Sequence, residues 1–223
     1  MRPEEKMPEA KIMNLTKSTI TAVVVTVSAV FAFAGYSHAE SCGAPDIEPS
    51  NYVARNCAYC HGPSVQGYAI APRLAGQHSA YLVIQLNRLR SGERNNPFSV
   101  NYMSHVAANV LPENECELAA YLSTLPPEAA GDGDEALVVK GEQIFKIGAP
   151  SDKVPACQFC HGPDGQGVGM FPRLAGQSYY YLKRRLEQWS EGYTKLAPHM
   201  PGIASQLSSE QIDAVASYLS FVR

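Results

Sequence analysis

A five-residue pattern, Cys-x-x-Cys-His, occurs twice in the chain, as Cys57-Ala58-Tyr59-Cys60-His61 and as Cys157-Gln158-Phe159-Cys160-His161. Two cysteines one helical turn apart can each add through the thiol to a vinyl group of haem, and the histidine that follows then lies beside the iron. A neutral imidazole nitrogen is a good ligand for iron. We therefore expect two covalently attached haem c groups, with His61 and His161 as axial ligands.

Other functions of paired cysteines fit this spacing less well. A four-cysteine zinc site has its two Cys-x-x-Cys pairs about 15–20 residues apart, and the pairs here are far more widely separated. A thioredoxin-like dithiol belongs to a βαβ unit, and no strand alternation flanks either copy. Neither these sites nor structural disulfides explain the histidine after each pair.

The surroundings of the two patterns are repeated as well. Residues 57–92 and 157–192 align without a gap and share 17 of 36 residues. The shared residues include the run Pro72 to Gln77, which is identical in the second copy. Self-similarity of this extent indicates a duplicated structural unit.

A haem that only transfers electrons needs a second axial ligand. The repeat alignment, whose offset changes from 100 to 97 downstream, places Met103 on Met200. A thioether is soft and uncharged, favours ferrous iron and raises the reduction potential. A single methionine would usually fill the core, but two that coincide in an alignment fixed by other residues indicate ligation. Three other histidines have no histidine at the aligned position of the other repeat: His78, His105 and His199. We expect each of them at the surface or in the second coordination shell.

Two further pairs of repeated residues are candidates for contacts around the haem. Pro72 and Pro172 can offer a backbone carbonyl to the free N–H of each axial histidine, which would fix its tautomer and ring orientation. Arg73 and Arg173 can pair with haem propionates, because a guanidinium group matches a carboxylate. The alternative for each arginine is an ordinary exposed charge.

The residues before Glu40 predict a segment that is removed on export. Ile20 to Gly35 is an apolar run of 16 residues, and Ser37-His38-Ala39 matches a signal-peptidase site. The run is shorter than the roughly 20 residues that span a bilayer, although an uncleaved membrane anchor is the alternative. We predict a cleaved signal peptide at 1–39 and a periplasmic protein, since haem attachment and disulfides belong outside the cytoplasm.

The chain that follows has room for two small domains. Its 184 residues carry 14 basic and 18 acidic side chains, a net charge of −4. This balance excludes nucleic acid as a partner, because binding to it needs a basic surface. Pro126 to Asp134 is rich in proline, glycine and aspartate and predicts an exposed linker. The predicted domains are 40–125 and 135–223.

Each unit has the pattern of helices. Ser178 to Gly192 carries apolar residues at helical spacing and ends at a glycine. Ser208 to Gln211 is a capping box that opens a last helix. Glu135 to Ile147 predicts an N-terminal helix, with Gly141 and Phe145 placed to pack on that last helix. No hairpin signal occurs, so we predict an all-α protein.

The two units together resemble the cytochrome c4 family. The motifs that carry the resemblance are C-x-x-C-H-G, the P-x-L-A-G-Q-x-x-x-Y-L segments at Pro72 to Leu82 and Pro172 to Leu182, and Met-x-x-[IV]-A at Met103 and Met200. The resemblance implies two tandem class I cytochrome c domains related by pseudo-twofold symmetry, with His/Met ligation at both irons. It also implies haems that approach through their propionate edges, in a protein that carries electrons from a respiratory donor to a terminal oxidase.

The first unit departs from the family pattern at its N-terminus. It has only a short helical piece, Glu48 to Arg55, without an equivalent of the glycine and phenylalanine of the second unit. It also has two extra cysteines, Cys42 and Cys116. We hypothesise a Cys42–Cys116 disulfide in place of the missing helix contact, the alternative being two unpaired thiols.

Three functions are open on this basis. The first is a diffusible electron carrier, not an enzyme, whose redox partners are a quinol-oxidising complex, a terminal oxidase or a dehydrogenase, met in transient contact with membrane complexes. The second is the dihaem electron-accepting subunit of a dehydrogenase such as flavocytochrome c sulfide dehydrogenase. The third is an enzyme acting at haem, such as a dihaem peroxidase or thiosulfate dehydrogenase, which needs an exchangeable axial position.

Overall fold

The computed structural model describes residues 46–194 and 197–223. In these residues the chain is helical, and its only β structure consists of isolated bridges between neighbouring loop residues. The all-α prediction is therefore confirmed. The predicted signal peptide and Cys42 lie outside the described residues. None of the helices in the described ranges combines the length and apolar character needed to cross a membrane.

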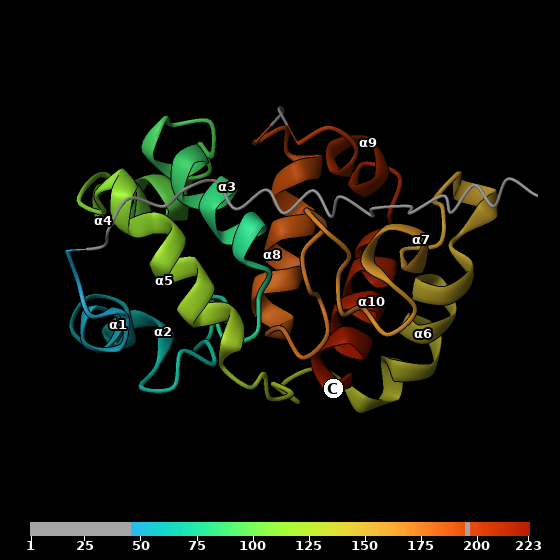
Figure 1. The fold of residues 1–223 in the computed structure, drawn as a ribbon. Coiled ribbons are helices and arrows are strands. Elements are labelled where there is room, and N and C mark those ends of the chain that lie inside the picture. The colour runs from blue at the N-terminus through green and yellow to red at the C-terminus, as the bar shows by residue number, and fades with distance from the viewer. Residues whose placement is uncertain (1–45, 195–196) are drawn as a thin grey trace, which may run out of the picture. The chain divides into compact units, whose positions relative to one another are not determined.

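The first repeat is built around three longer helices, of which α3 and α5 pack on each other (Figure 1). Val53 of α1, Leu82 of α3 and Leu118 of α5 meet in its buried core. Helix α5 begins at a proline, whose missing N–H costs nothing in the first turn. The elements are α1 (Pro49–Asn56), α2 (Ala58–His61), α3 (Ser79–Arg90), the π-helical turn η1 (Ser99–Met103), α4 (Ser104–Ala108) and α5 (Pro112–Thr124).

The second repeat has the same order of helices and a longer N-terminal one. Its last helix starts at the predicted capping box, in which the Ser208 hydroxyl accepts from the Gln211 N–H and the Gln211 side chain accepts from the Ser208 N–H. The elements are η2 (Glu135–Leu137), α6 (Val138–Ile147), η3 (Pro150–Asp152), α7 (Gln158–His161), α8 (Tyr179–Ser190), α9 (Met200–Ala204) and α10 (Ser209–Phe221).

Helix α6 crosses α10 in close contact at a glycine (Figure 1). A Cβ atom at Gly141 would lie 2.0 Å from the carbonyl oxygen of Ala214 and 2.6 Å from Cβ of Tyr218, so only glycine fits. One turn later Phe145 is fully buried, with its ring centroid 5.6 Å from that of Tyr218. The predicted packing of Gly141 and Phe145 on the last helix is confirmed.

The N-terminal part of the first repeat is held differently. Helix α1 is short and contacts α5, and the N–H of Asp46 donates to the Asn114 side chain at 3.2 Å. Cys116, in α5, is disulfide-bonded. Its predicted partner Cys42 lies outside the described residues, so the pairing remains a prediction.

The segment between α5 and η2 is bonded to the second repeat from Ala130 onward. The N–H of Ala130 donates to the Gly176 carbonyl at 3.1 Å, and the N–H of Gly131 donates to the Ser220 carbonyl at 2.9 Å. The N–H of Asp134 donates to the Ser217 hydroxyl at 3.1 Å. The predicted linker is thus exposed at several residues but fixed to α10 rather than loose.

Two glutamines join the repeats within the compact unit that residues 39–223 form. The side chain of Gln177 accepts from the N–H of Arg73 at 2.7 Å and donates to its carbonyl at 3.1 Å. The side chain of Gln77 accepts from the N–H of Arg173 at 2.8 Å and donates to its carbonyl at 2.9 Å. The same two bonds run in both directions, as pseudo-twofold symmetry requires. We call these four bonds the glutamine clasp.

Candidate haem sites

Each Cys-x-x-Cys-His pattern forms one tight helical turn. In α2 the N–H groups of Cys60 and His61 both donate to the carbonyl of Cys57, at 3.2 and 3.0 Å, and the same bonds recur in α7. The turn leaves the second cysteine exposed while the histidine is buried. Gly62, with φ of +83°, ends it in a conformation that side chains rarely adopt. Two thiols and one imidazole are thereby presented from a single turn.

Both histidines of the Cys-x-x-Cys-His motifs, His61 and His161, have a fixed tautomer. The Nδ1 atom of His61 lies 2.7 Å from the carbonyl oxygen of Pro72, and that of His161 lies 3.0 Å from the carbonyl oxygen of Pro172. Since a carbonyl can only accept, Nδ1 carries the proton and Nε2 keeps its lone pair for iron. The hydrogen bonds predicted for both prolines are confirmed.

The same histidines are kept neutral by their surroundings. Burial lowers the pKa of both imidazoles below the ordinary value, and this effect outweighs the proline carbonyl, which acts in the opposite direction. The charge of Arg94 lowers the pKa of His61 further. A neutral imidazole is the form that binds iron, so the protein prepares each histidine for ligation.

A loop follows each histidine and returns to it. The N–H of Gly67 donates to the carbonyl of His61 at 2.9 Å, and the N–H of Gly167 donates to that of His161 at 2.8 Å. A Cβ atom at Gly67 would lie 2.8 Å from the backbone nitrogen of Arg73. Glycine is therefore required where the loop folds against the segment that supplies the proline carbonyl.

Met103 and Met200 occupy matching places after the long helices α3 and α8. Met103 ends the π-helical turn η1, a kind of turn that is frequent at functional sites, and Met200 opens α9. Both side chains are half-buried. His105 and His199, beside them, are exposed. Ligation by the two methionines remains a prediction.

The two arginines after the prolines differ in their contacts. Arg73 is buried, donates through Nη1 to the carbonyl of Gly176, and donates through Nε to the Gln66 side chain at 2.7 Å. Arg173 is half-buried, and its buried Nε has no partner among the described residues. The propionate role stays a prediction for both, and more donor capacity is available on Arg173.

A buried polar cluster crosses between the repeats. Arg94 donates through Nη2 to the hydroxyl of Tyr181 at 3.1 Å, and Arg185 donates through Nη1 to the side chain of Asn96 at 3.2 Å. The guanidinium of Arg185 also lies 4.5 Å from the ring centroid of Trp189. Burial, reinforced by the charge of Arg94, lowers the pKa of Arg185 to about 10. Sequence reasoning missed this cluster because neither arginine is repeated.

The residues around the two histidines fit haem. Buried cations are normally paired with anions, yet within residues 46–194 and 197–223 neither Arg94 nor Arg185 forms a hydrogen bond or ion pair with a carboxylate. A haem brings two propionates. In these ranges four buried polar atoms lack a hydrogen-bond partner, and each of them could donate to a propionate: Arg94 Nε, Arg173 Nε, Trp189 Nε1 and Thr194 Oγ1.

Taken with two turns that each present two thiols and a neutral imidazole, these sites define a dihaem c-type cytochrome. Comparison with known families agrees: residues 50–126 match the cytochrome c family, and residues 137–219 match the family described as cytochrome c oxidase, cbb3-type, subunit III. Each repeat is thus a cytochrome c domain, and the chain carries two covalently bound haem c groups.

Among known relatives, the cytochrome c4 of Thiocapsa roseopersicina is 37% identical over 171 residues, which cover 73% of this chain and 85% of the relative. The chain therefore belongs to the cytochrome c4 family. The structure of Acidithiobacillus ferrooxidans cytochrome c4 superposes with a TM-score of 0.70 at 38% identity, covering 74% of this chain and 98% of that one.

The chain is also similar to a relative that is named for a different role. The thiosulfate dehydrogenase electron acceptor of Stutzerimonas stutzeri (strain A1501) is 41% identical over 180 residues, covering 78% of this chain and 82% of the relative. The relatives are thus cytochromes and electron acceptors, and this chain is an electron-transfer protein rather than an enzyme. The predicted family, fold and cofactor are confirmed.

Proposed function

We propose that this chain is a periplasmic electron carrier that moves electrons between respiratory-chain partners by outer-sphere transfer. The observation that carries the proposal is that both axial histidines are buried, neutral and bonded through Nδ1 to a proline carbonyl. Each haem, when bound, supplies one iron that exchanges a single electron. The protein's part is to hold both axial ligands in place so that no substrate reaches the metal.

The residues of each repeat divide this work. Cys57, Cys60, Cys157 and Cys160 would attach the two haems, and Met103 and Met200 would each supply a second iron ligand. Pro72 and Pro172 hold the histidine rings. Arg173, whose buried Nε has no partner among the described residues, would pair with a propionate, and Arg73 would do so with the donors that its bonds to Gly176 and Gln66 leave free. A ligand set that persists in both oxidation states keeps the reorganisation on electron transfer small, and a thioether raises the potential. The signal peptide proposed at 1–39 would deliver the chain to the compartment where haem attachment occurs.

The partners follow from the chemistry of a small one-electron carrier. Redox encounters bury little area and are brief. We propose a quinol-oxidising complex as donor and a terminal oxidase or reductase as acceptor, both met in transient contact at the membrane.

A second candidate donor is a periplasmic dehydrogenase, with this chain as its dihaem acceptor. Two observations favour it. One relative is named a thiosulfate dehydrogenase electron acceptor. The structure of the thiosulfate dehydrogenase TsdBA from Marichromatium purpuratum superposes with a TM-score of 0.67 at 32% identity, covering 78% of this chain and 40% of that one. A dehydrogenase of the flavocytochrome c sulfide dehydrogenase type, with this chain as its dihaem electron-accepting subunit, is another form of this candidate.

Stopped-flow reduction of the oxidised holoprotein separates these candidates. We would mix it with a thiosulfate dehydrogenase and thiosulfate, and separately with a quinol-oxidising complex and quinol. Rapid reduction of both haems by either donor supports the function of an electron carrier, and the donor that reduces the protein faster is the one we would assign to it. A protein that neither donor reduces, or that oxidises thiosulfate without a dehydrogenase, would contradict the proposal.

A further inference from the structure

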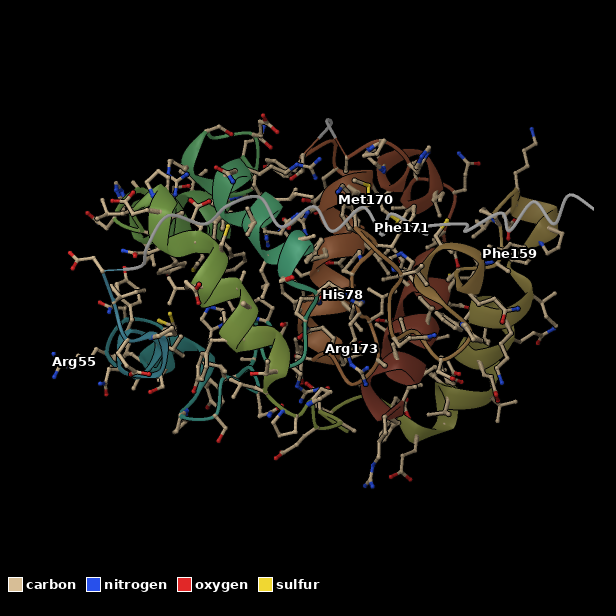
Figure 2. All side chains as sticks on the ribbon, in the orientation of Figure 1. Arg55, His78, Phe159, Met170, Phe171 and Arg173 are labelled. Atoms are coloured by element: carbon tan, nitrogen blue, oxygen red, sulfur yellow. The ribbon has the colours of Figure 1, made fainter. Side chains whose placement is uncertain are left out.

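We propose that His78, which belongs to the first repeat, is a positioning residue for the haem site of the second repeat. His78 lies at the N-cap of α3, and Figure 2 shows it between the two repeats, beside the segment of Arg173. Its Nε2 atom lies 2.9 Å from the carbonyl oxygen of Gln166, in the loop that follows His161. The imidazole therefore donates across the repeat boundary. This inference rests on the proposed function, since it concerns the potential of the second haem.

The imidazole also packs against the backbone of that loop. A Cβ atom at Gly167 would lie 2.5 Å from Nε2 of His78, so the ring rests directly on the glycine. On its other side the same Cβ would lie 2.6 Å from the Phe171 carbonyl oxygen and 2.7 Å from the Arg173 nitrogen. The loop is thus held between His78 and the segment that contains Pro172.

This segment controls the axial histidine. The carbonyl of Pro172 lies 3.0 Å from Nδ1 of His161, and the rings of Phe171 and His161 are in an edge-to-face arrangement with their centroids 6.0 Å apart. A hydrogen bond at Nδ1 raises the basicity of an iron-bound imidazole and so favours ferric iron. Support for the loop by His78 therefore stabilises this bond and lowers the potential of the second haem.

The first repeat supports its own loop by another route. The side chain of Gln66 donates to the Pro126 carbonyl at 2.8 Å and accepts from the N–H of Glu128 at 3.1 Å, so the linker holds this loop. The aligned Gln166 instead accepts from the N–H of Asp164 at 3.0 Å, within its own loop. Among the residues that the structure describes, no linker residue bonds to the side chain of Gln166, and the His78 imidazole instead donates to the Gln166 carbonyl from the other repeat.

The residue aligned with His78 makes a smaller contact. The hydroxyl of Ser178 donates to the carbonyl of Ala69 at 2.8 Å and lies 2.9 Å from the Asp132 carboxylate. The three atoms nearest to a Cβ atom at Gly67 all belong to the backbone of the first repeat, whereas the atom nearest to a Cβ atom at Gly167 is Nε2 of His78. The effect of His78 should therefore be specific to the second haem.

The test compares His78→Ser, which installs the serine found at the aligned position, with His78→Gln, whose amide can still donate to Gln166. His105→Ala, at an exposed histidine, is the matched control. In the reduced holoprotein, NMR measures exchange of the Nδ1 proton of each axial histidine, and spectroelectrochemistry gives the two potentials. We expect His78→Ser to increase the exchange rate of the His161 Nδ1 proton about tenfold. We also expect it to increase the equilibrium constant for reduction of the second haem about threefold.

The first haem and the His105→Ala protein should not change, and His78→Gln should restore most of the effect. Equal changes at both haems, or no change at either, would overturn the role of His78 while leaving the carrier function intact. Absence of a haem or of a methionine ligand in the unaltered protein would instead contradict the proposed function. The two failures are therefore distinguishable.

Discussion

The glutamine clasp makes a quantitative prediction, because its two halves have the same bonds but different burial. The Gln177 half is buried: Gln177 and Arg73 are both 5% exposed. In Gln177→Ala the N–H and carbonyl of Arg73 lose their partners at 2.7 and 3.1 Å and stay out of water. A buried polar group without a partner costs about 1–3 kcal/mol. We expect the free energy of unfolding to fall by about 2–4 kcal/mol.

The Gln77 half provides the internal control. Gln77 makes bonds of 2.8 and 2.9 Å to the backbone of Arg173. Gln77 itself is 6% exposed, but Arg173 is half-buried where Arg73 is buried, so these bonds are only partly buried. Water can therefore replace the lost side chain, and each bond then contributes only about 0.5–1.5 kcal/mol. We expect Gln77→Ala to cost about 1–2 kcal/mol, less than the same change at Gln177.

Urea unfolding of the holoprotein, followed by haem absorbance and by far-ultraviolet circular dichroism, measures both variants. Gln177→Met, which keeps the length of the side chain and removes its polar atoms, should destabilise as much as Gln177→Ala, because Arg73 is again left without partners. The reasoning would be refuted if Gln77→Ala cost more than Gln177→Ala, or if both stayed within about 0.5 kcal/mol, as ordinary surface substitutions do.

Three further predictions concern packing, ligation and pH. Gly141→Ala, whose Cβ would lie 2.0 Å from the Ala214 carbonyl oxygen, should lower the free energy of unfolding by about 2–3 kcal/mol, while Gly202→Ala, which meets nothing within 4 Å, should change it little in the same urea assay. Met200→Ala should halve the strength of the sulfur-to-iron absorption band and let carbon monoxide bind the reduced second haem. Burial lowers the pKa of His61 below its ordinary value, so as the pH falls the unfolded chain takes up this proton more readily than the folded chain. The free energy of unfolding in urea should therefore be lower at pH 5 than at pH 7, and a higher value at pH 5 would contradict this.

The repeat made much of each haem site predictable. A residue that performs the same task in both units is identical at a fixed offset in the sequence, and Pro72 and Pro172, which bond to the two histidines, are such a pair. Gly141 was predictable for another reason, since a glycine within a helical pattern indicates a close approach of two backbones. Both kinds of signal are local in the sequence.

Residues that act only once, or across the repeat boundary, were not predictable. Arg94 and Arg185 look like ordinary surface cations in the sequence, and only the fold buries them beside each other. Gln77 and Gln177 are identical in the two units, but identity alone does not distinguish a core residue from an interface residue. The propionate role of Arg73 stays a prediction, but its bond to the Gly176 carbonyl of the other repeat is a contact that no pattern within one unit indicates.

The central claim is that both irons are closed electron-transfer centres with histidine and methionine ligands. An optical spectrum of the oxidised holoprotein, with haem quantified per chain and carbon monoxide added to the reduced form, tests it most directly. We predict two haems per chain, a weak long-wavelength sulfur-to-iron band of the strength that two Met–iron bonds give, and no change with carbon monoxide. A single haem, a band of half this strength or a reduced form that binds carbon monoxide would contradict the account.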